Sequence, residues 1–432
     1  MSENTFRSTL DADSIALFKK KVLSWAKQFE VCCLLDSNDY QQDDYAEYEF
    51  LFAAKPAREL ISNQQSFEKL KAFHNDEKSW LFGFFCYDLK NEVENLQSNN
   101  FDGIRLPHLY FFEPSILITI KNNTVEVSSS EPSPQDVFNQ VMDKLVLPRK
   151  EQTTLSYFQP AMPRVQYLET VHQIKNHIVE GDIYEMNFCQ EWYATVPGLD
   201  PYVTYDKFND ISSSPFAAFF RLHARSLMCQ SPERFLKKTG DLLISQPIKG
   251  TVKRGTDVEE DERLKLELAN SEKDKAENIM IVDLVRNDLS KSCIPGTVEV
   301  PELFSVYDFE HVFQMISTVT GKIKKDVHFV DAIKNAFPMG SMTGAPKVMS
   351  MQLIEHYELS KRGLYSGALG YIKPEGDFDF NVVIRSLLFN SESDYLSYHA
   401  GGAIVYDSDS EKEYDETVLK ASGMMKVFLP TV

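Results

Sequence analysis

The N-terminal part of the chain alternates short apolar runs with polar stretches, and this pattern predicts strands separated by helices or turns. Three apolar runs have the length of buried strands: Val31–Leu35, Ser79–Tyr87 and Ser115–Ile120. The polar stretches between them are long enough to form helices. We therefore expect mixed α and β structure in an N-terminal region of residues 1–150 that contributes strands and helices to a shared core.

Two breaks in the pattern separate this region from the rest of the chain. Ser128–Pro134 is rich in serine and proline, which favours a connector. A second polar break follows at Leu147–Thr154. We place a second, longer region at residues 155–432 and expect the chemistry there.

The longer region mixes strand and helix patterns without strict alternation. It begins with an amphipathic helix at Arg164–Glu180, closed by Gly181. The charged stretch from Asp257 runs into an apolar one ending at Asp288 without Gly or Pro, which predicts one long helix. Strands are predicted at Ile183–Trp192, Phe216–Leu222 and Ser226–Gln230. Their hairpin-like spacing favours an α+β fold with large antiparallel sheets.

Composition excludes several classes of partner. The 432 residues include 64 acidic and 45 basic ones, a net charge of -19, with no basic tract for nucleic acid or an anionic membrane. No apolar run approaches the ~20 residues that cross a bilayer, and the polar N-terminus does not resemble a signal peptide. We expect a cytoplasmic protein whose six cysteines, none in a C-x-x-C pair, are reduced and buried.

Two predicted helices each present a pair of carboxylates three residues apart. Asp274 and Glu277 form one pair, and Glu413 and Glu416 form the other. Carboxylate oxygens are suitable ligands for Mg²⁺, which also keeps water and substrate oxygens. The alternatives are a solvated helix face and an S-x-x-E capping box at Ser410–Glu413.

Lys249 stands between Pro247-Ile248 and Gly250, and its amine becomes a candidate nucleophile if the surroundings are closed. A solvated surface charge is the alternative. Arg385, in the predicted strand Phe380–Leu388, suits a bidentate carboxylate clamp or a structural ion pair.

Two glycine-containing segments offer places where an anion can approach the backbone. Gly401 and Gly402 follow a predicted strand at Tyr395–Ala400, and they mark either an anion site or a bulge or turn. Phe337–Lys347 leads into a helix that continues to about Glu358, but it lacks the G-K-[ST] of a P-loop. No cysteine lies in a G-x-C-x-G elbow with a downstream histidine, so we expect no glutaminase nucleophile in this chain.

Six ordered motifs resemble those of the chorismate-utilising enzymes, which include the large subunits of anthranilate synthase and aminodeoxychorismate synthase, and the isochorismate and salicylate synthases. The motifs are Ser231–Glu233, Pro247–Thr251, Ala276–Asp288, Gly340–Lys347, Tyr365–Tyr371 and Gly401–Val405. The resemblance implies a layered α/β/β/α architecture, with large antiparallel sheets packed face to face and flanked by helices.

The resemblance also implies roles for individual residues. Glu277 and Glu416 match the family's Mg²⁺ ligands, with Asp274 and Glu413 in support. Glu233 matches the general acid and base at the 4-hydroxyl of chorismate, a role that favours a raised carboxyl pKa. The remaining matches are substrate-binding positions: Arg385, Tyr365, Gly401, Gly402, Ser341, Thr251 and Gln314.

Lys249 separates the branches of the family, because anthranilate synthase-like chains carry alanine there. The lysine implies attack of the amine on ring carbon 2, then addition of ammonia at carbon 4 to give 4-amino-4-deoxychorismate for p-aminobenzoate and folate. The ammonia would come from a glutamine amidotransferase subunit. We expect a depressed pKa for Lys249, because only the neutral amine attacks.

Two positions depart from the family pattern. Glu185 stands where water-using relatives have lysine and amine-adding ones have glutamine, and Gln314 stands where many members have histidine. A carboxylate at 185 argues against water as the nucleophile. Two other functions remain open: an anthranilate synthase large subunit, and a catalytically silent chorismate-binding subunit.

Overall fold

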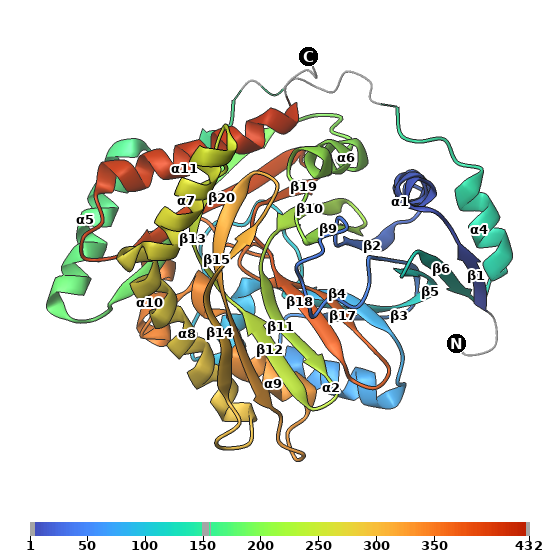
Figure 1. Cartoon of the computed structure of the whole chain (residues 1–432), viewed down its shortest axis with the longest axis horizontal. Helices are drawn as coiled ribbons and strands as arrows, with labels where there is room; N and C mark the ends of the chain where they lie inside the picture. The colour runs from blue at the N-terminus through green and yellow to red at the C-terminus, as the bar shows by residue number, and fades with distance from the viewer. Residues whose placement is uncertain (1–4, 149–154, 156, 429–432) are drawn as a thin grey trace.

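The computed structural model describes residues 5–148, 155 and 157–428, and it has an α+β fold built on antiparallel ladders (Figure 1). The strands are β1 (Thr5–Thr9), β2 (Val31–Asp36), β3 (Phe50–Ser62), β4 (Leu81–Phe85), β5 (Leu109–Lys121), β6 (Thr124–Ser129), β7 (Gln159–Pro160), β8 (Glu185–Thr195), β9 (Phe216–Leu222), β10 (Arg225–Ser231), β11 (Arg234–Thr239), β12 (Leu242–Gln246), β13 (Ile248–Lys253), β14 (Glu299–Asp308), β15 (Val312–Lys322), β16 (Gly344–Ala345), β17 (Ala368–Ile372), β18 (Phe378–Val382), β19 (Ser386–Asn390) and β20 (Tyr395–Ile404). The α-helices are α1 (Ala12–Ala26), α2 (Ser66–Asp76), α3 (Lys90–Val93), α4 (Pro134–Met142), α5 (Arg164–Glu180), α6 (Pro201–Ile211), α7 (Val258–Asn270), α8 (Glu272–Ser292), α9 (Phe329–Ala336), α10 (Lys347–Tyr357) and α11 (Ser410–Met425). Short 3₁₀ turns are η1 (Tyr87–Leu89), η2 (Gly340–Met342) and η3 (Lys426–Phe428).

One continuous ladder passes through most of the strands, in the order β8, β20, β19, β10, β9, β2, β3, β5, β4, β17, β18, β11, β12 and β15. The long strands β3 and β5 carry it from one layer to the other. Only Phe50–Ala54 of β3 pairs with β2, and only Leu109–Phe112 of β5 pairs with β4. A register shift after Pro56 bends the pair.

The two layers of this sheet face each other across an apolar core. Phe84 on β4 packs edge-on against Phe220 on β9, with ring centroids 5.3 Å apart, although the two strands belong to different layers. The same core includes Cys33 on β2 and Phe380 on β18, both fully buried. The predicted α+β fold with sheets packed face to face is therefore confirmed.

Helices cover the outer faces of the layers. In Figure 1, α11, α6, α1 and α4 lie along one side of the molecule, and α8, α9 and α2 lie along the opposite side. On the first side Trp25 of α1 contacts Phe52 of β3 at 5.9 Å between ring centroids. The apolar faces of these helices are thus removed from water by the sheet, which is the main stabilising term in such a fold.

Most predicted elements are confirmed, with small shifts at their ends. The helix Arg164–Glu180 ends as predicted at Gly181, which adopts the left-handed conformation with φ of 87°. The connector after β6 and the strands β2, β4, β8, β9 and β10 lie where the pattern placed them, whereas β5 begins at Leu109, well before the predicted Ser115. All six cysteines are unpaired and buried.

The single long helix predicted from Asp257 to Asp288 is wrong. The structure has two helices, α7 and α8, separated at Ser271. The Ser271 side chain accepts a hydrogen bond from the backbone N–H of Asp274, so it caps the start of α8. The sequence did not indicate this cap, because the charged residues on both sides of Ser271 are compatible with a continuous helix.

The predicted strand Phe380–Leu388 is also interrupted. Strand β18 ends at Val382 and β19 begins at Ser386, so Val383–Arg385 lies between the two strands. Arg385 has a φ of 48°. Ser366 donates its backbone N–H to the carbonyl of Val383, and Gln230 donates to that of Arg385. These long-range bonds displace the chain from the ladder, and no local pattern encodes them.

The structure also bears on the glycines of β20, the cap of α11 and the question of a membrane-spanning helix. Gly401 and Gly402 lie within β20 rather than at its end. Asp409 caps α11, so the S-x-x-E alternative at Ser410–Glu413 is wrong. Among the described residues no helix is long and apolar enough to cross a membrane.

The division near residue 150 remains a prediction, because residues 149–154 of the predicted break lie outside the described part. The two regions share one sheet, since β2 pairs with β9 and β4 pairs with β17.

Candidate active site

A cavity of about 500 Å³ opens between the acidic helices α8 and α11 and the strands β13, β15 and β20. This volume suits a small organic molecule. All the residues predicted for the site line it: Glu233, Lys249, Thr251, Asp274, Glu277, Gln314, Ser341, Tyr365, Arg385, Gly401, Gly402, Glu413 and Glu416. Residues from six of the sequence motifs therefore meet in one place.

Lys249 reaches the cavity from an irregular part of β13. The register between β13 and β15 shifts between Ile248 and Thr251, and Gly250 has a φ of 93°. Such a bulge re-aims the side chains beside it. The Lys249 side chain is 11% exposed, and its Nζ donates to Oε1 of Glu185 at 2.7 Å. It is a buried ion-paired amine and not a solvated surface charge.

The predicted depression of the Lys249 pKa is wrong. Burial alone would lower the pKa of this amine, but the Glu185 carboxylate raises it above its usual value, with Glu277 and Glu233 adding to the effect. The Glu185 side chain is only 1% exposed, so little water screens the pair. Lys249 therefore rests as an ammonium.

Glu233 lies in the short link between β10 and β11, and it is buried. Burial raises the pKa of its carboxyl to about 7, while Ser341, Lys249 and Arg385 oppose that rise. Ser341 on η2 donates from Oγ to Oε1 of Glu233 at 2.7 Å. The raised pKa expected for a proton donor is thus found here.

Arg385 is held by its unusual backbone conformation against the cavity wall. Within the described residues no hydrogen bond or ion pair to its guanidinium is found, although Glu233 and the hydroxyl of Tyr398 lie within electrostatic reach. Burial lowers the pKa of Arg385. A half-buried guanidinium without a carboxylate partner favours an anionic ligand over the structural ion pair.

Two neighbours on the ladder offer polar groups to the same cavity. Thr251 on β13 is the cross-strand partner of Gln314 on β15. Gln314 is buried, and its Oε1 has no hydrogen-bond partner among the described residues. Buried side-chain oxygens are normally satisfied, so this one suits a ligand donor or water.

The four predicted metal ligands come from the facing helices α8 and α11. Glu277 lies 3.7 Å from Nζ of Lys273, and Lys420 donates to both Glu416 and the carbonyl of Gly401, at 2.7 and 2.6 Å. Burial raises the pKa of Glu277 and of Glu413, and the neighbouring carboxylates add to that rise. The concentration of negative charge fits a divalent cation.

The glycines of β20 have different surroundings. A Cβ on Gly401 would lie 2.0 Å from the carbonyl oxygen of Phe188, so this glycine allows close packing on β8. A Cβ on Gly402 would meet Oε2 of Glu413 at 3.4 Å instead. Packing therefore explains Gly401 even without a ligand.

Comparison with known proteins assigns the chain to a family. Residues 30–426 match the chorismate binding enzymes. The chain belongs to this family. It is 34% identical to aminodeoxychorismate synthase component 1 of Escherichia coli over 83% of the chain and 79% of that protein. It is also 34% identical to anthranilate synthase component 1 of Saccharolobus solfataricus, over 80% of each protein.

Solved structures agree with this assignment. The crystal structure of anthranilate synthase component I from Streptococcus pneumoniae superposes with a TM-score of 0.77 at 26% identity, over 89% of this chain and 94% of that one. This chorismate binding enzyme therefore has the anthranilate synthase component I-like fold.

Several cavity residues of this chorismate binding enzyme were not assigned from the sequence: Asn187, Lys273, Tyr398, His399 and Lys420. Two of these residues, Lys273 and Lys420, could have been found from their spacing in the sequence. Lys420 lies four residues after Glu416, and Lys273 lies four before Glu277, the spacing of paired charges on a helix. Tyr365 lines the cavity as predicted, but its hydroxyl lies 3.5 Å from Sγ of Cys189.

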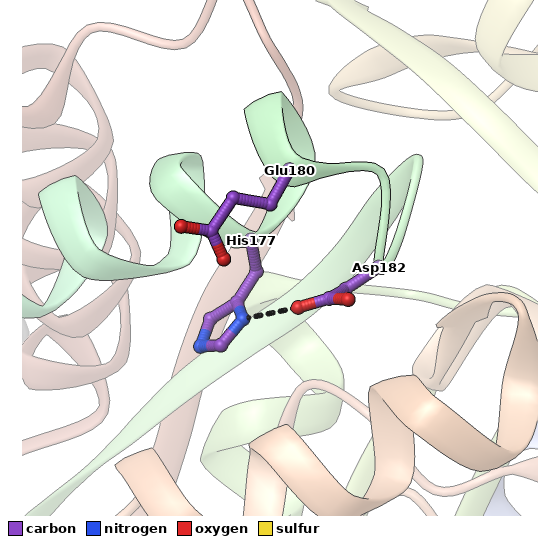
Figure 2. Close-up of side chains that lie close together, drawn as sticks. All are labelled: His177, Glu180 and Asp182. Carbon is purple, nitrogen blue, oxygen red and sulfur yellow. Dashed lines mark hydrogen bonds and ion pairs between the residues drawn. The ribbon is translucent and has the colours of Figure 1, made fainter.

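One compact group of potential metal ligands lies elsewhere in the described part of the chain. Figure 2 shows His177, Glu180 and Asp182 at the end of α5. Both ring nitrogens of His177 are already engaged, Nδ1 with Asp182 at 2.8 Å and Nε2 with the hydroxyl of Tyr357 at 3.0 Å. None of the three lines the cavity, and His177, Asp182 and Tyr357 form a structural hydrogen-bond network.

Proposed function

We propose that this chain is the synthase component of an aminodeoxychorismate synthase, which replaces the 4-hydroxyl of chorismate with an amino group. The observation that carries the proposal is the buried amine of Lys249 in the wall of the cavity that Glu233 also lines. The names of the relatives agree with it, since several are aminodeoxychorismate synthases.

In the first step the neutral Lys249 amine attacks ring carbon 2. The ring double bonds shift, and the bond from carbon 4 to its hydroxyl breaks. Glu233 gives its proton to that hydroxyl, which leaves as water. The pKa of about 7 keeps a large fraction of this carboxyl protonated near neutral pH.

In the second step ammonia adds at carbon 4. The double bonds return, and the bond between carbon 2 and Lys249 breaks to release a neutral amine. The new ammonium at carbon 4 gives one proton to the Glu233 carboxylate, which restores the acid. The enolpyruvyl group is kept throughout.

Binding of the substrate is assigned to polar groups in the cavity wall. Arg385 would hold the enolpyruvyl carboxylate, together with Tyr365 and the backbone at Gly401 and Gly402. The free Oε1 of Gln314 would accept a hydrogen bond from a substrate hydroxyl, and the Thr251 hydroxyl would contact another substrate oxygen. Ser341 would orient Glu233 through the hydrogen bond described above.

Glu277 and Glu416 are proposed to hold Mg²⁺, with Asp274 and Glu413 in support. No three of these four residues bring carboxylate oxygens within 4.8 Å of one another in the described structure. This suits Mg²⁺, which takes one or two carboxylates and fills its other positions with oxygens of water and substrate. When bound, the ion would neutralise the ring carboxylate of chorismate.

We propose that a glutamine amidotransferase subunit supplies the ammonia. We also propose that the chain works in the cytoplasm. The product would serve p-aminobenzoate and folate synthesis. Anthranilate synthase is the rival function, because one relative has that name at the same identity. Lys249 favours amination with retention of the enolpyruvyl group.

The test is product analysis. The purified chain is incubated with chorismate, Mg²⁺ and ammonium at mildly alkaline pH, and the products are identified by mass. We expect an aminated product that keeps the enolpyruvyl group. Anthranilate or isochorismate would overturn the proposal, and absence of turnover would favour a catalytically silent chorismate-binding subunit.

A further inference from the structure

The resting state of Lys249 presents a chemical difficulty for the proposed reaction. Its Nζ donates to Glu185 in a buried ion pair, and an ammonium has no lone pair with which to attack carbon 2. One proton must therefore leave Nζ before the covalent bond forms. The group that takes this proton determines when the nucleophile becomes active.

The charged groups around Lys249 come from several elements. Glu277 and Asp274 on α8 and Glu233 between β10 and β11 contribute negative charge. Lys273 on α8, Lys420 on α11 and Arg385 contribute positive charge, and Glu413 and Glu416 complete the acidic side of α11. Within the described residues only Glu185 accepts a hydrogen bond from Nζ.

We propose that Glu185 is a catalytic residue that accepts the proton of Lys249 before attack on chorismate and returns it when the lysine is released. This role rests on the proposed function of the chain. Glu185 does not line the cavity and lies behind Lys249, so it contacts the reacting nitrogen and not the substrate.

The backbone of Glu185 is held firmly enough for this role. Glu185 is the first residue of β8, and it pairs with Ala345 of β16. Its carbonyl also accepts a hydrogen bond from Oγ of Ser350 at 3.3 Å. The adjacent Gly344 fits only because it lacks a side chain, since a Cβ there would lie 2.2 Å from the Glu185 carbonyl oxygen.

The second carboxylate oxygen of Glu185 supplies an independent argument. Oε2 is buried and has no hydrogen-bond partner among the described residues. Buried side-chain oxygens normally have a hydrogen-bond partner, so Oε2 is a free acceptor beside the ammonium of Lys249. A proton carried on Oε2 also leaves the lone pair of Nζ free to face the substrate.

The protons balance over the cycle. Glu185 takes one proton from the Lys249 ammonium, and Glu233 gives one to the departing hydroxyl. After ammonia adds, the ammonium at carbon 4 returns a proton to Glu233. Lys249 leaves carbon 2 as a neutral amine and takes its proton back from Glu185. The net change is chorismate plus ammonia to aminodeoxychorismate plus water.

The test measures the rate of covalent adduct formation against pH, with Mg²⁺ and chorismate present and ammonia absent. Adduct is followed by intact mass as chorismate minus one water. In the unmodified chain the proton stays within the Glu185–Lys249 pair, so the rate should hold from about pH 7 down to about pH 6. Glu185→Gln keeps a hydrogen-bond acceptor but cannot take a proton.

In Glu185→Gln, Lys249 must lose its proton to water. We expect an acidic limb on which the rate falls about tenfold per pH unit, and a lower rate at the optimum, because Glu233 must stay protonated while Lys249 loses its proton. Glu185→Asp keeps a carboxylate, so it should show the parental profile at a lower rate. The exposed Glu180→Gln, five residues earlier, is the matched control and should behave as the parent.

Two adverse outcomes have different meanings. If Glu185→Gln and the unmodified chain form adduct with one shared pH profile, the role of Glu185 is overturned and the proposed function stands. If the unmodified chain forms no adduct at any pH, the proposed function is overturned, and the inference falls with it. Thermal melts of each variant separate these results from loss of folding.

Discussion

Ser341 donates a hydrogen bond to Glu233 at 2.7 Å, and this contact favours the charged form of a carboxyl whose pKa burial raises to about 7. The acid role of Glu233 requires the protonated form. Adduct formation should therefore decline as pH rises above about 7.

Replacement of Ser341 by alanine removes a contact that lowers the pKa of Glu233. The pKa should rise further, so the decline should move to higher pH. The pH profile of adduct formation checks this, with the exposed Ser290→Ala on α8 as control. A decline that stays in place, or moves to lower pH, would contradict the assignment.

Arg385→Ala should raise KM for chorismate by about 10- to 100-fold, because a hydrogen bond to a charged group contributes roughly 1.5–3 kcal/mol. The guanidinium has no partner among the described residues, so its loss leaves no buried charge unpaired. Steady-state kinetics and a thermal melt provide the readouts. Arg263→Ala, which removes an exposed arginine on α7, is the control. A large drop in Tm with unchanged KM would assign Arg385 a structural role.

Glu277→Gln and Glu416→Gln should each raise the Mg²⁺ concentration needed for half-maximal activity, since each removes a charged oxygen ligand. EDTA should abolish activity, and added Mg²⁺ should restore it. Glu272→Gln on the same helix α8, with a side chain 91% exposed, is the control. A Mg²⁺ titration indistinguishable from the parent in both variants would place the metal elsewhere.

Gly401→Ala should destabilise the protein strongly, because the new Cβ would lie 2.0 Å from the Phe188 carbonyl and force β20 away from β8. Gly423→Ala is the matched comparison. This glycine lies within α11, and a methyl group added to it would have nothing within 4 Å, so alanine should stabilise the helix by about 0.5–1 kcal/mol. Thermal melts should move in opposite directions; equal shifts would contradict the packing argument.

The sequence predicted local features and the residues that line the cavity better than it predicted the pKa values of those residues. Gly181 ends α5 through its own backbone freedom, so a local pattern was enough. The bend at Arg385 depends on hydrogen bonds from Ser366 and Gln230, which are distant in sequence. No motif spacing could have shown them.

The Lys249 pKa was mispredicted for the same reason. Glu185 and Lys249 are 64 positions apart, and only the fold brings β8 beside β13. The prediction of a depressed pKa rested on the need for a neutral amine in the attack, and it took no account of a carboxylate beside the lysine. The raised pKa of Glu233, which was expected from its role in the resemblance, is found because burial is the largest effect on this carboxyl.

The most direct test of the central claim is the mass of the chain after incubation with chorismate and Mg²⁺ without ammonia. We predict an adduct of chorismate minus one water, mapped by peptide analysis to Lys249 and discharged by ammonium as aminodeoxychorismate. Lys249→Ala should remain folded and form no adduct. Aminodeoxychorismate formed by Lys249→Ala at the parental rate would contradict the covalent role of Lys249.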